Sequence, residues 1–314
     1  MVDLDFGIQI EPQFGFTYDD IKEIALEAER LGFESLWVSD HFFLTKENIG
    51  TNCLECYTTL TALSRDTTTL RLGPMVTGQN YRNPALLANI AASLDHISGG
   101  RLNFGIGAGW KVVEYGAYGY EFPKPMVRIR QLEETIEIAK VMWTQEKATY
   151  KGRYYSVEDA LCYPHPVQKP HIPVWVGGSG YQTLKVSAKH ADAVNFAWSQ
   201  PPEFFEKLGI LRKHCERYGT DYDAIRKSAG LMITMEESPE ELEEELRDQR
   251  DKKDTPYRRY LSKQPPNIVD TPEVVAERIG EYVSLGFDHF ILRFNYGQEI
   301  EKMRLFMDKV RDRI

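Results

Sequence analysis

Residues 35–42 read Ser35-Leu36-Trp37-Val38-Ser39-Asp40-His41-Phe42, and this stretch decides the fold. It begins with four residues suited to a buried strand, just after an amphipathic helical stretch that ends at Gly32. The titratable pair Asp40-His41 follows where the strand ends. An α/β barrel holds its catalytic groups at the carboxyl ends of its parallel strands, so the stretch predicts an enzyme of that fold.

The rest of the chain repeats this unit, because short apolar runs alternate with amphipathic helical stretches. Eight strands are expected: Phe6 to Ile10, Ser35 to Ser39, Leu72 to Thr77, Leu102 to Ile106, Val174 to Gly177, Ala193 to Phe196, Ala229 to Thr234 and Phe290 to Phe294. The first four are about 30 residues apart, which fits right-handed βα crossovers. The pattern predicts the α/β class and a (β/α)8 TIM barrel, with residues 1–314 as a single domain.

Two spacings are longer than a βα loop and predict insertions, after strands 4 and 7. The first covers approximately residues 145–172 and ends in a proline-rich stretch. The second covers approximately residues 236–270 and begins with a charged helix, Pro239 to Lys253, whose charges suit a solvated face. Residues 255–260 (TPYRRY) carry tyrosines and arginines that suit a lid.

The composition argues against several classes of partner and location. Forty-seven acidic against 38 basic residues give a net charge of -9, which argues against nucleic acid as a partner. No apolar run approaches the roughly 20 residues of a membrane span, and residues 1–5 lack the features of a signal peptide. We therefore expect a cytoplasmic protein with no membrane partner.

The four cysteines are few for this length and do not have the spacing of a zinc site. Cys53 and Cys56 form a CxxC pair, but a zinc site takes about four ligands and no second CxxC follows. We expect no metal site.

Two glycine clusters follow expected strands. In Gly105-Ile106-Gly107-Ala108-Gly109-Trp110, a dinucleotide fingerprint would need a glycine where Trp110 stands, so that reading fails. These glycines suit either packing against another backbone or a ligand. Gly177-Gly178-Ser179-Gly180 precedes a helix, and amides at a helix N-terminus suit a phosphate, the alternative being a tight turn.

Together these segments resemble the luciferase-like monooxygenase superfamily, and especially its branch that uses the deazaflavin coenzyme F420. The motifs that carry the resemblance are residues 32–42, Tyr81-Arg82-Asn83-Pro84-Ala85, Ile97-Ser98-Gly99-Gly100-Arg101-Leu102, Gly105 to Trp110 and Pro173 to Gly178.

The resemblance implies a cofactor site. Asp40 and His41 would contact the deazaflavin or the substrate, and a cis peptide between Met75 and Val76 would form a backstop to the ring, with Thr77 at the ring edge. Gly107, Ala108 and Gly109 would flank the cofactor's chain, while Gly177, Gly178, Ser179 and Gly180 would hold its phosphate. Relatives pair through helices of the second and third βα units, which implies a homodimer.

The acid–base residues follow from position and chemistry. Histidine exchanges protons most readily near neutral pH, so His41 is the candidate for moving a proton, with Asp40 orienting it or bonding the ring. Glu11 follows the end of the first strand, and the sequence leaves two roles open for it: a catalytic role, or an exposed or capping role. Sugar-phosphate dehydrogenases of the F420 branch carry a glutamate where this chain has Trp110, which speaks against glucose 6-phosphate as the substrate.

Three functions stay open. The first is an F420-dependent oxidoreductase that transfers a hydride between the deazaflavin and a small organic substrate at the barrel mouth. The second is a monooxygenase that uses flavin mononucleotide (FMN) on the same barrel, and the third is a non-catalytic flavin-binding protein.

Overall fold

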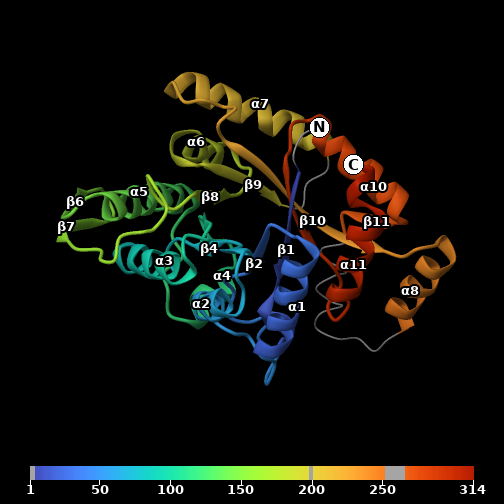
Figure 1. The fold of residues 1–314 in the computed structure, drawn as a ribbon. Coiled ribbons are helices and arrows are strands. Elements are labelled where there is room, and N and C mark those ends of the chain that lie inside the picture. The colour runs from blue at the N-terminus through green and yellow to red at the C-terminus, as the bar shows by residue number, and fades with distance from the viewer. Residues whose placement is uncertain (1–3, 198–200, 252–265) are drawn as a thin grey trace.

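The computed structural model describes residues 4–197, 201–251 and 266–314. Its centre is a parallel sheet (Figure 1). Neighbouring strands are hydrogen-bonded in the order β3-β2-β1-β12-β10-β9-β8-β5-β4. β3 (Arg71–Pro74) and β4 (Thr77–Gly78) are two parts of one stretch of chain, so the two ends of this order meet. A parallel bridge between Leu72 and Leu102 joins the same neighbours. The sheet is therefore a barrel, as the sequence predicts.

The other barrel strands lie close to their expected bounds. They are β1 (Asp5–Ile10), β2 (Ser35–Val38), β5 (Phe104–Gly107), β8 (Val174–Gly177), β9 (Ala193–Ala197), β10 (Arg226–Met235) and β12 (His289–Arg293). The third expected strand differs most, since it breaks between β3 and β4. The Met75–Val76 peptide at this break is cis, as the resemblance implied.

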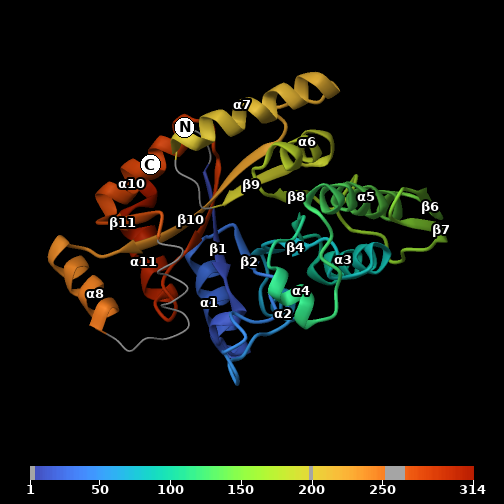
Figure 2. The same cartoon turned by 180° about the vertical axis from the view of Figure 1, so that it is seen from behind.

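A helix follows each barrel strand and covers the outside of the sheet, as the view from behind in Figure 2 also shows. These helices are α1 (Tyr18–Leu31), α2 (Cys56–Asp66), α3 (Pro84–Ser98), α5 (Pro125–Thr144), α6 (Tyr181–His190), α7 (Pro201–Tyr218), α10 (Pro272–Ser284) and α11 (Glu299–Lys309). Shorter pieces are η1 (Pro12–Phe14), α4 (Val112–Ala117) and η2 (Arg311–Arg313). No helix in the described ranges is both long and apolar enough to cross a bilayer.

α1 shows how the local sequence sets these boundaries. Thr17 and Asp20 form a capping box, in which each side chain accepts the other's backbone N–H. The helix buries Ile21, Ile24, Ala25 and Ala28, a helical spacing that turns one apolar face to the sheet. It ends at Gly32, whose φ of 84° favours glycine.

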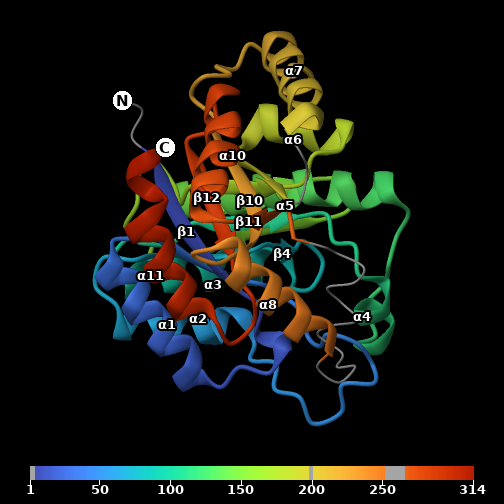
Figure 3. The same cartoon turned by 90° about the vertical axis from the view of Figure 1, so that its right-hand side faces the viewer.

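Both predicted insertions contain secondary structure. Residues 145–172 hold an antiparallel hairpin, β6 (Ala148–Lys151) and β7 (Ser156–Ala160), which follows α5. The second insertion holds α8 (Pro239–Asp251) and β11 (Ile268–Asp270), which extends the sheet beside β10. α8 stands to one side of the barrel in Figure 1 and faces the viewer in Figure 3. The segment 255–260, predicted as a lid, lies outside the described residues.

The barrel interior is filled below its carboxyl end. Trp37 and Trp175 lie 4.8 Å apart between ring centroids, and Ile291 packs with them. Met75 rests against this cluster and is only partly buried. These side chains fill the barrel beneath a cavity at the carboxyl ends of the strands.

The alternating glycines make room for the break in the third strand. A Cβ on Gly105 would lie 1.9 Å from the Pro74 carbonyl oxygen. A Cβ on Gly107 or Gly177 would lie 2.9 or 2.8 Å from a methyl group of Val76. In the cluster that begins at Gly105, packing therefore accounts for Gly105 and Gly107. Gly177 likewise leaves space for Val76.

Candidate active site

A cavity of about 430 Å³ lies at the carboxyl end of the barrel strands. It gathers most of the predicted site residues, which come from the ends of five barrel strands: Glu11, Asp40, His41, Met75, Val76, Thr77, Gly107, Ala108, Gly109, Gly177 and Gly178. Ser179 and Gly180 continue the same loop but do not line it. Gln9, Ser39, Tyr81, Trp110 and Asn195 line it as well. The predicted residues thus share one site, while their individual contacts with a cofactor stay predictions.

His41 is held by a buried carboxylate that the sequence analysis missed. The His41 Nδ1 atom lies 2.8 Å from Oε2 of Glu114, which has no exposed surface. An ionised carboxylate can only accept hydrogen bonds, so Nδ1 carries the proton of this contact. In the neutral ring, Nε2 is then the atom able to take a proton from a molecule in the cavity.

Glu114 collects several further donors. Its Oε1 accepts hydrogen bonds from the backbone N–H of Phe42 (2.9 Å) and Phe43 (3.3 Å) and from Lys111 Nζ (3.0 Å), and its Oε2 also accepts from the Tyr81 hydroxyl at 2.9 Å. Burial alone would raise the pKa of Glu114, but the contact with His41 and these donors lower it to about 2. Glu114 is therefore ionised at neutral pH.

Asp40 makes a different contact from the one predicted. Both of its carboxylate oxygens accept from the Arg82 guanidinium, at 2.7 and 3.0 Å. Arg82 also holds Glu55 and lies over the Tyr57 ring, 4.7 Å from its centroid. The prediction that Asp40 orients His41 is wrong, because Glu114 has that position. Asp40 still lines the cavity, so a contact with a cofactor ring stays a prediction.

Glu11 is part of a buried ion pair. Its Oε1 lies 2.8 Å from Arg293 Nη1 and accepts from Gln9 Nε2 at 2.9 Å, and its Oε2 accepts from Gln13. Glu11 is 6% exposed and Arg293 is 3% exposed. The exposed role that the sequence left open is therefore wrong. With its charge matched by Arg293, Glu11 orders the cavity wall, and nothing in this geometry supports its predicted catalytic role.

Trp110 forms an aromatic edge of the cavity. Its ring lies edge-on to His41 with centroids 5.6 Å apart, and the residue is 63% exposed. Gly109, just before it, has a φ of 76°, and a Cβ there would collide with the Tyr115 hydroxyl at 1.8 Å. Glycine at this position lets the chain turn so that the Trp110 indole lies at the open edge of the cavity.

The loop after β8 has the features of an anion site. Gly178 adopts a φ of 124°, a conformation open to glycine, and Gly180 is the N-cap of α6. Gly180 offers no side-chain cap, so the first-turn amides of α6 lack an intrahelical or capping acceptor. Such amides favour a phosphate group.

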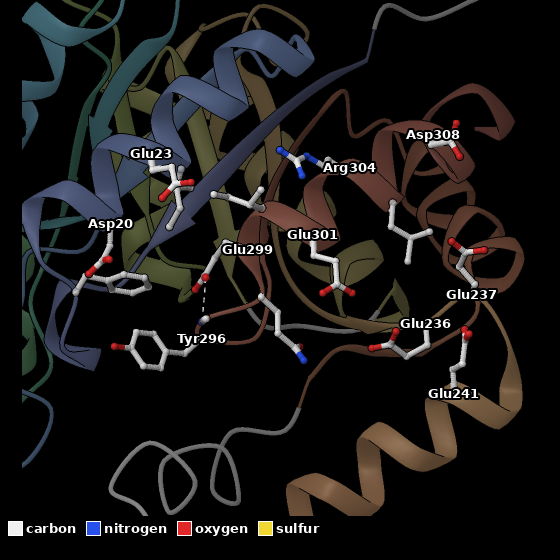
Figure 4. A pocket seen from close by; sticks show the side chains of 16 residues that line it. Asp20, Glu23, Glu236, Glu237, Glu241, Tyr296, Glu299, Glu301, Arg304 and Asp308 are labelled. Carbon is white, nitrogen blue, oxygen red and sulfur yellow. Dashed lines mark hydrogen bonds between the residues drawn. The ribbon is translucent and has the colours of Figure 1, made fainter.

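A second cavity, of about 1040 Å³, lies farther along the same rim between α1, α8 and α11. Figure 4 shows carboxylates crowding around it, and burial raises the pKa of Glu299 in its wall to about 7. It contains none of the predicted site residues.

One group of side chains has the composition of a metal site. Glu133 and Glu137 on α5 and His190 on α6 bring three possible ligand atoms within 4.8 Å of one another. The Lys189 ammonium already contacts Glu133, and the Tyr150 hydroxyl donates to Glu137. The Glu133 carboxylate in this group is therefore already paired with a lysine charge.

The missed residues left weak signals. Glu114 follows the fourth barrel strand in the first turn of a short helix, a place close to the mouth but seven residues past that strand. Arg82 belongs to a motif that carried the resemblance, yet nothing in the sequence pairs it with Asp40, 42 positions earlier.

Comparison with known proteins agrees with this architecture. An F420-dependent glucose-6-phosphate dehydrogenase of Microbacterium testaceum is 28% identical, covering 100% of this chain and 98% of the relative. A 5,10-methylenetetrahydromethanopterin reductase of Archaeoglobus fulgidus is 31% identical over 64% of this chain and 55% of its own length. The structure of an F420-dependent secondary alcohol dehydrogenase, bound to an F420–acetone adduct, has a TM-score of 0.82 at 20% identity, with 98% of both chains covered.

Monooxygenases share the fold as well. A long-chain alkane monooxygenase has a TM-score of 0.83 at 15% identity, over 100% of this chain and 92% of its own. The sequence model of the family described as luciferase-like monooxygenase matches residues 5–289. The chain belongs to the luciferase-like monooxygenase family.

Proposed function

We propose that this protein is an F420-dependent oxidoreductase that moves a hydride between the deazaflavin and a small organic substrate at the barrel mouth. The observation that carries the proposal is the His41–Glu114 pair at the cavity, where it would handle the proton that accompanies a hydride. The Microbacterium testaceum relative, which is named for F420-dependent chemistry and is 28% identical over the whole chain, supports the choice of cofactor.

The residues present fit a deazaflavin. The cavity wall has a smooth apolar part at Val76, Gly107 and Gly177, which suits a flat ring, and the uncapped first turn of α6 suits a phosphate. Met75 and Val76 would support the ring, and Gly178, Ser179 and Gly180 would hold the phosphate. Bound F420 supplies a ring carbon that accepts or donates a hydride.

The chain's own residues would transfer the proton and exclude water from the reacting group. Glu114 fixes the His41 ring so that Nε2 is the free base, able to take a proton from a substrate hydroxyl or return one to a carbonyl oxygen. Trp110, next to His41, would cover the reacting group and limit access of water. Arg82 keeps Asp40 in place at the cavity wall.

A binding titration against F420 and FMN tests the cofactor. We expect tight binding of F420 and deazaflavin reduction or oxidation that depends on a second substrate. Binding of FMN with oxygen-dependent product formation, and none of F420, would favour the monooxygenase. Binding of either cofactor without turnover on any substrate would favour the non-catalytic flavin-binding protein.

Replacing Ser179 with aspartate should weaken F420 binding by about tenfold or more, because a like charge beside the phosphate opposes it. The rate at saturating cofactor should stay near that of the wild type, since Ser179 lies outside the cavity that holds His41. Fluorescence titration gives the dissociation constant and steady-state kinetics give kcat. Ser179→Asn is the matched uncharged control, and equal weakening by both variants would contradict the electrostatic reason.

A homodimer and a cytoplasmic location stay predictions. The dimer would form through α2 and α3, where Leu86 is 55% exposed, and light scattering should return about twice the 36.2 kDa of the chain. Replacing Leu86 with arginine should then shift the mass toward that of a monomer. A wild-type monomer at working concentration would end this prediction.

A further inference from the structure

The charges at the active-site cavity are already matched within the protein. Among the described residues that line it, the carboxylates are Glu11 and Asp40, His41 is the one imidazole, and there is no lysine or arginine. The nearby cations each hold an anion: Arg293 holds Glu11 at 2.8 Å, Arg82 holds Asp40 at 2.7 Å, and Lys111 holds Glu114 at 3.0 Å. The amides of the loop after β8 would already hold the cofactor phosphate, so an anionic group on a substrate would have to take one of these cations and leave its buried partner unmatched.

The neighbouring rim adds a negative field. The described residues around the second cavity include eight carboxylates and one arginine, Arg304 (Figure 4). Lys302 pairs with Glu236 and Glu301, Arg304 contacts Glu27, and the pKa of Glu299 is raised to about 7, so an excess of ionised carboxylates remains. This rim adjoins the active site through Phe14. The Phe14 ring centroid lies 6.2 Å from that of Tyr296, which lines the rim, and 6.0 Å from Cζ of Arg293, which pairs with Glu11. A concave surface lined with one sign of charge lowers the local concentration of ligands of the same sign.

The exposed edge of the mouth is aromatic instead. Trp110 stands beside His41 and keeps 63% of its surface exposed. Met75 and Val76 also line the cavity, where the deazaflavin ring would cover them, so Trp110 is the apolar surface left to the substrate. An apolar or aromatic group next to the reacting carbon of a substrate would contact this surface when that carbon's oxygen is near His41.

We propose, on the basis of the function proposed above, that the substrate is an uncharged alcohol or carbonyl compound with an apolar or aromatic group beside its reacting carbon, and not a sugar phosphate. In the oxidising direction the C–H and O–H bonds of the alcohol break and its C=O bond forms. The hydride leaves with its electron pair to the deazaflavin, and the proton goes to His41. Trp110 and the Glu11–Arg293 pair set this preference.

Matched probes test the charge. Benzyl alcohol against 4-(hydroxymethyl)benzoate, and glucose against glucose 6-phosphate, differ chiefly by one anionic group. With the F420-loaded wild-type enzyme we expect each neutral probe to show at least about tenfold lower dissociation constant or higher kcat/KM than its anionic partner. Equal or better use of the anionic partners, or no binding of either neutral probe, overturns the proposal. Failure of F420 itself to bind contradicts the proposed function instead.

Two variants assign the preference to residues. Glu11→Gln keeps the side-chain shape but removes the anion that holds Arg293, so the ratio of neutral to anionic kcat/KM should fall about tenfold. Trp110→Ala should weaken benzyl alcohol about threefold to tenfold more than it weakens glucose, because only the benzyl ring contacts the indole. Thermal melting shows whether Glu11→Gln is folded. If it is not folded, the wild-type probe pairs still test the charge preference and Trp110→Ala still tests the apolar contact. An unchanged ratio in folded Glu11→Gln and unchanged benzyl alcohol binding in Trp110→Ala overturn these assignments.

Discussion

Replacing His41 with glutamine is expected to lower kcat by about 10²–10⁴-fold, the usual contribution of a positioned general acid or base. Glutamine occupies similar space but cannot take up a proton. The dissociation constant of F420 should change by less than about threefold, because the imidazole sits at the catalytic edge of the cavity and the phosphate loop lies after β8. Steady-state kinetics and fluorescence titration measure the two quantities separately.

The control for this variant is His96→Gln, an exposed histidine on α3 that should leave both quantities unchanged. A variant that keeps more than a third of wild-type kcat would remove His41 from the proton-transfer step.

The sequence predicted the barrel because the fold depends on a repeating local pattern. Each expected strand is a short apolar run with its own helix behind it, and the carboxyl ends of such strands meet at one rim. Asp40, His41 and the glycine loops therefore lie around one cavity, although 137 positions separate His41 from Gly178. Strand bounds shifted by a few residues, since strand ends depend on pairing with neighbours that the sequence does not show.

The partners of these residues were harder to predict, because a long-range hydrogen bond leaves no local pattern. Glu114 is 73 positions from His41, and Arg293 is 282 positions from Glu11. The sequence placed Asp40 beside His41 in the chain, but adjacent residues near a strand end point in different directions. In space Asp40 turns to Arg82 and His41 turns to Glu114.

Replacing Glu114 with glutamine should reduce kcat about 10²–10⁴-fold by reversing the His41 tautomer. Oε1 of Glu114 accepts from three donors: the backbone N–H groups of Phe42 and Phe43 and the Lys111 ammonium. The amide oxygen of glutamine must take that position, which puts its NH₂ group against Nδ1 of His41. Nδ1 then accepts, the ring proton moves to Nε2, and the base facing the cavity is lost.

Tyr81→Phe is the control, since it removes another donor to Oε2 but keeps the carboxylate, and it should cost less than about tenfold in kcat. Acid stability gives a readout independent of activity. The pKa of Glu114 is lowered from 4.5 to about 2 in the folded protein, so its charge stabilises the fold above pH 4.5, and this stabilisation is lost as the pH falls toward 2. The difference in free energy of unfolding between wild type and Glu114→Gln should therefore shrink across that window. Wild-type kcat in Glu114→Gln, together with a stability difference that is constant with pH, would show that the carboxylate neither orients His41 nor carries a charge there.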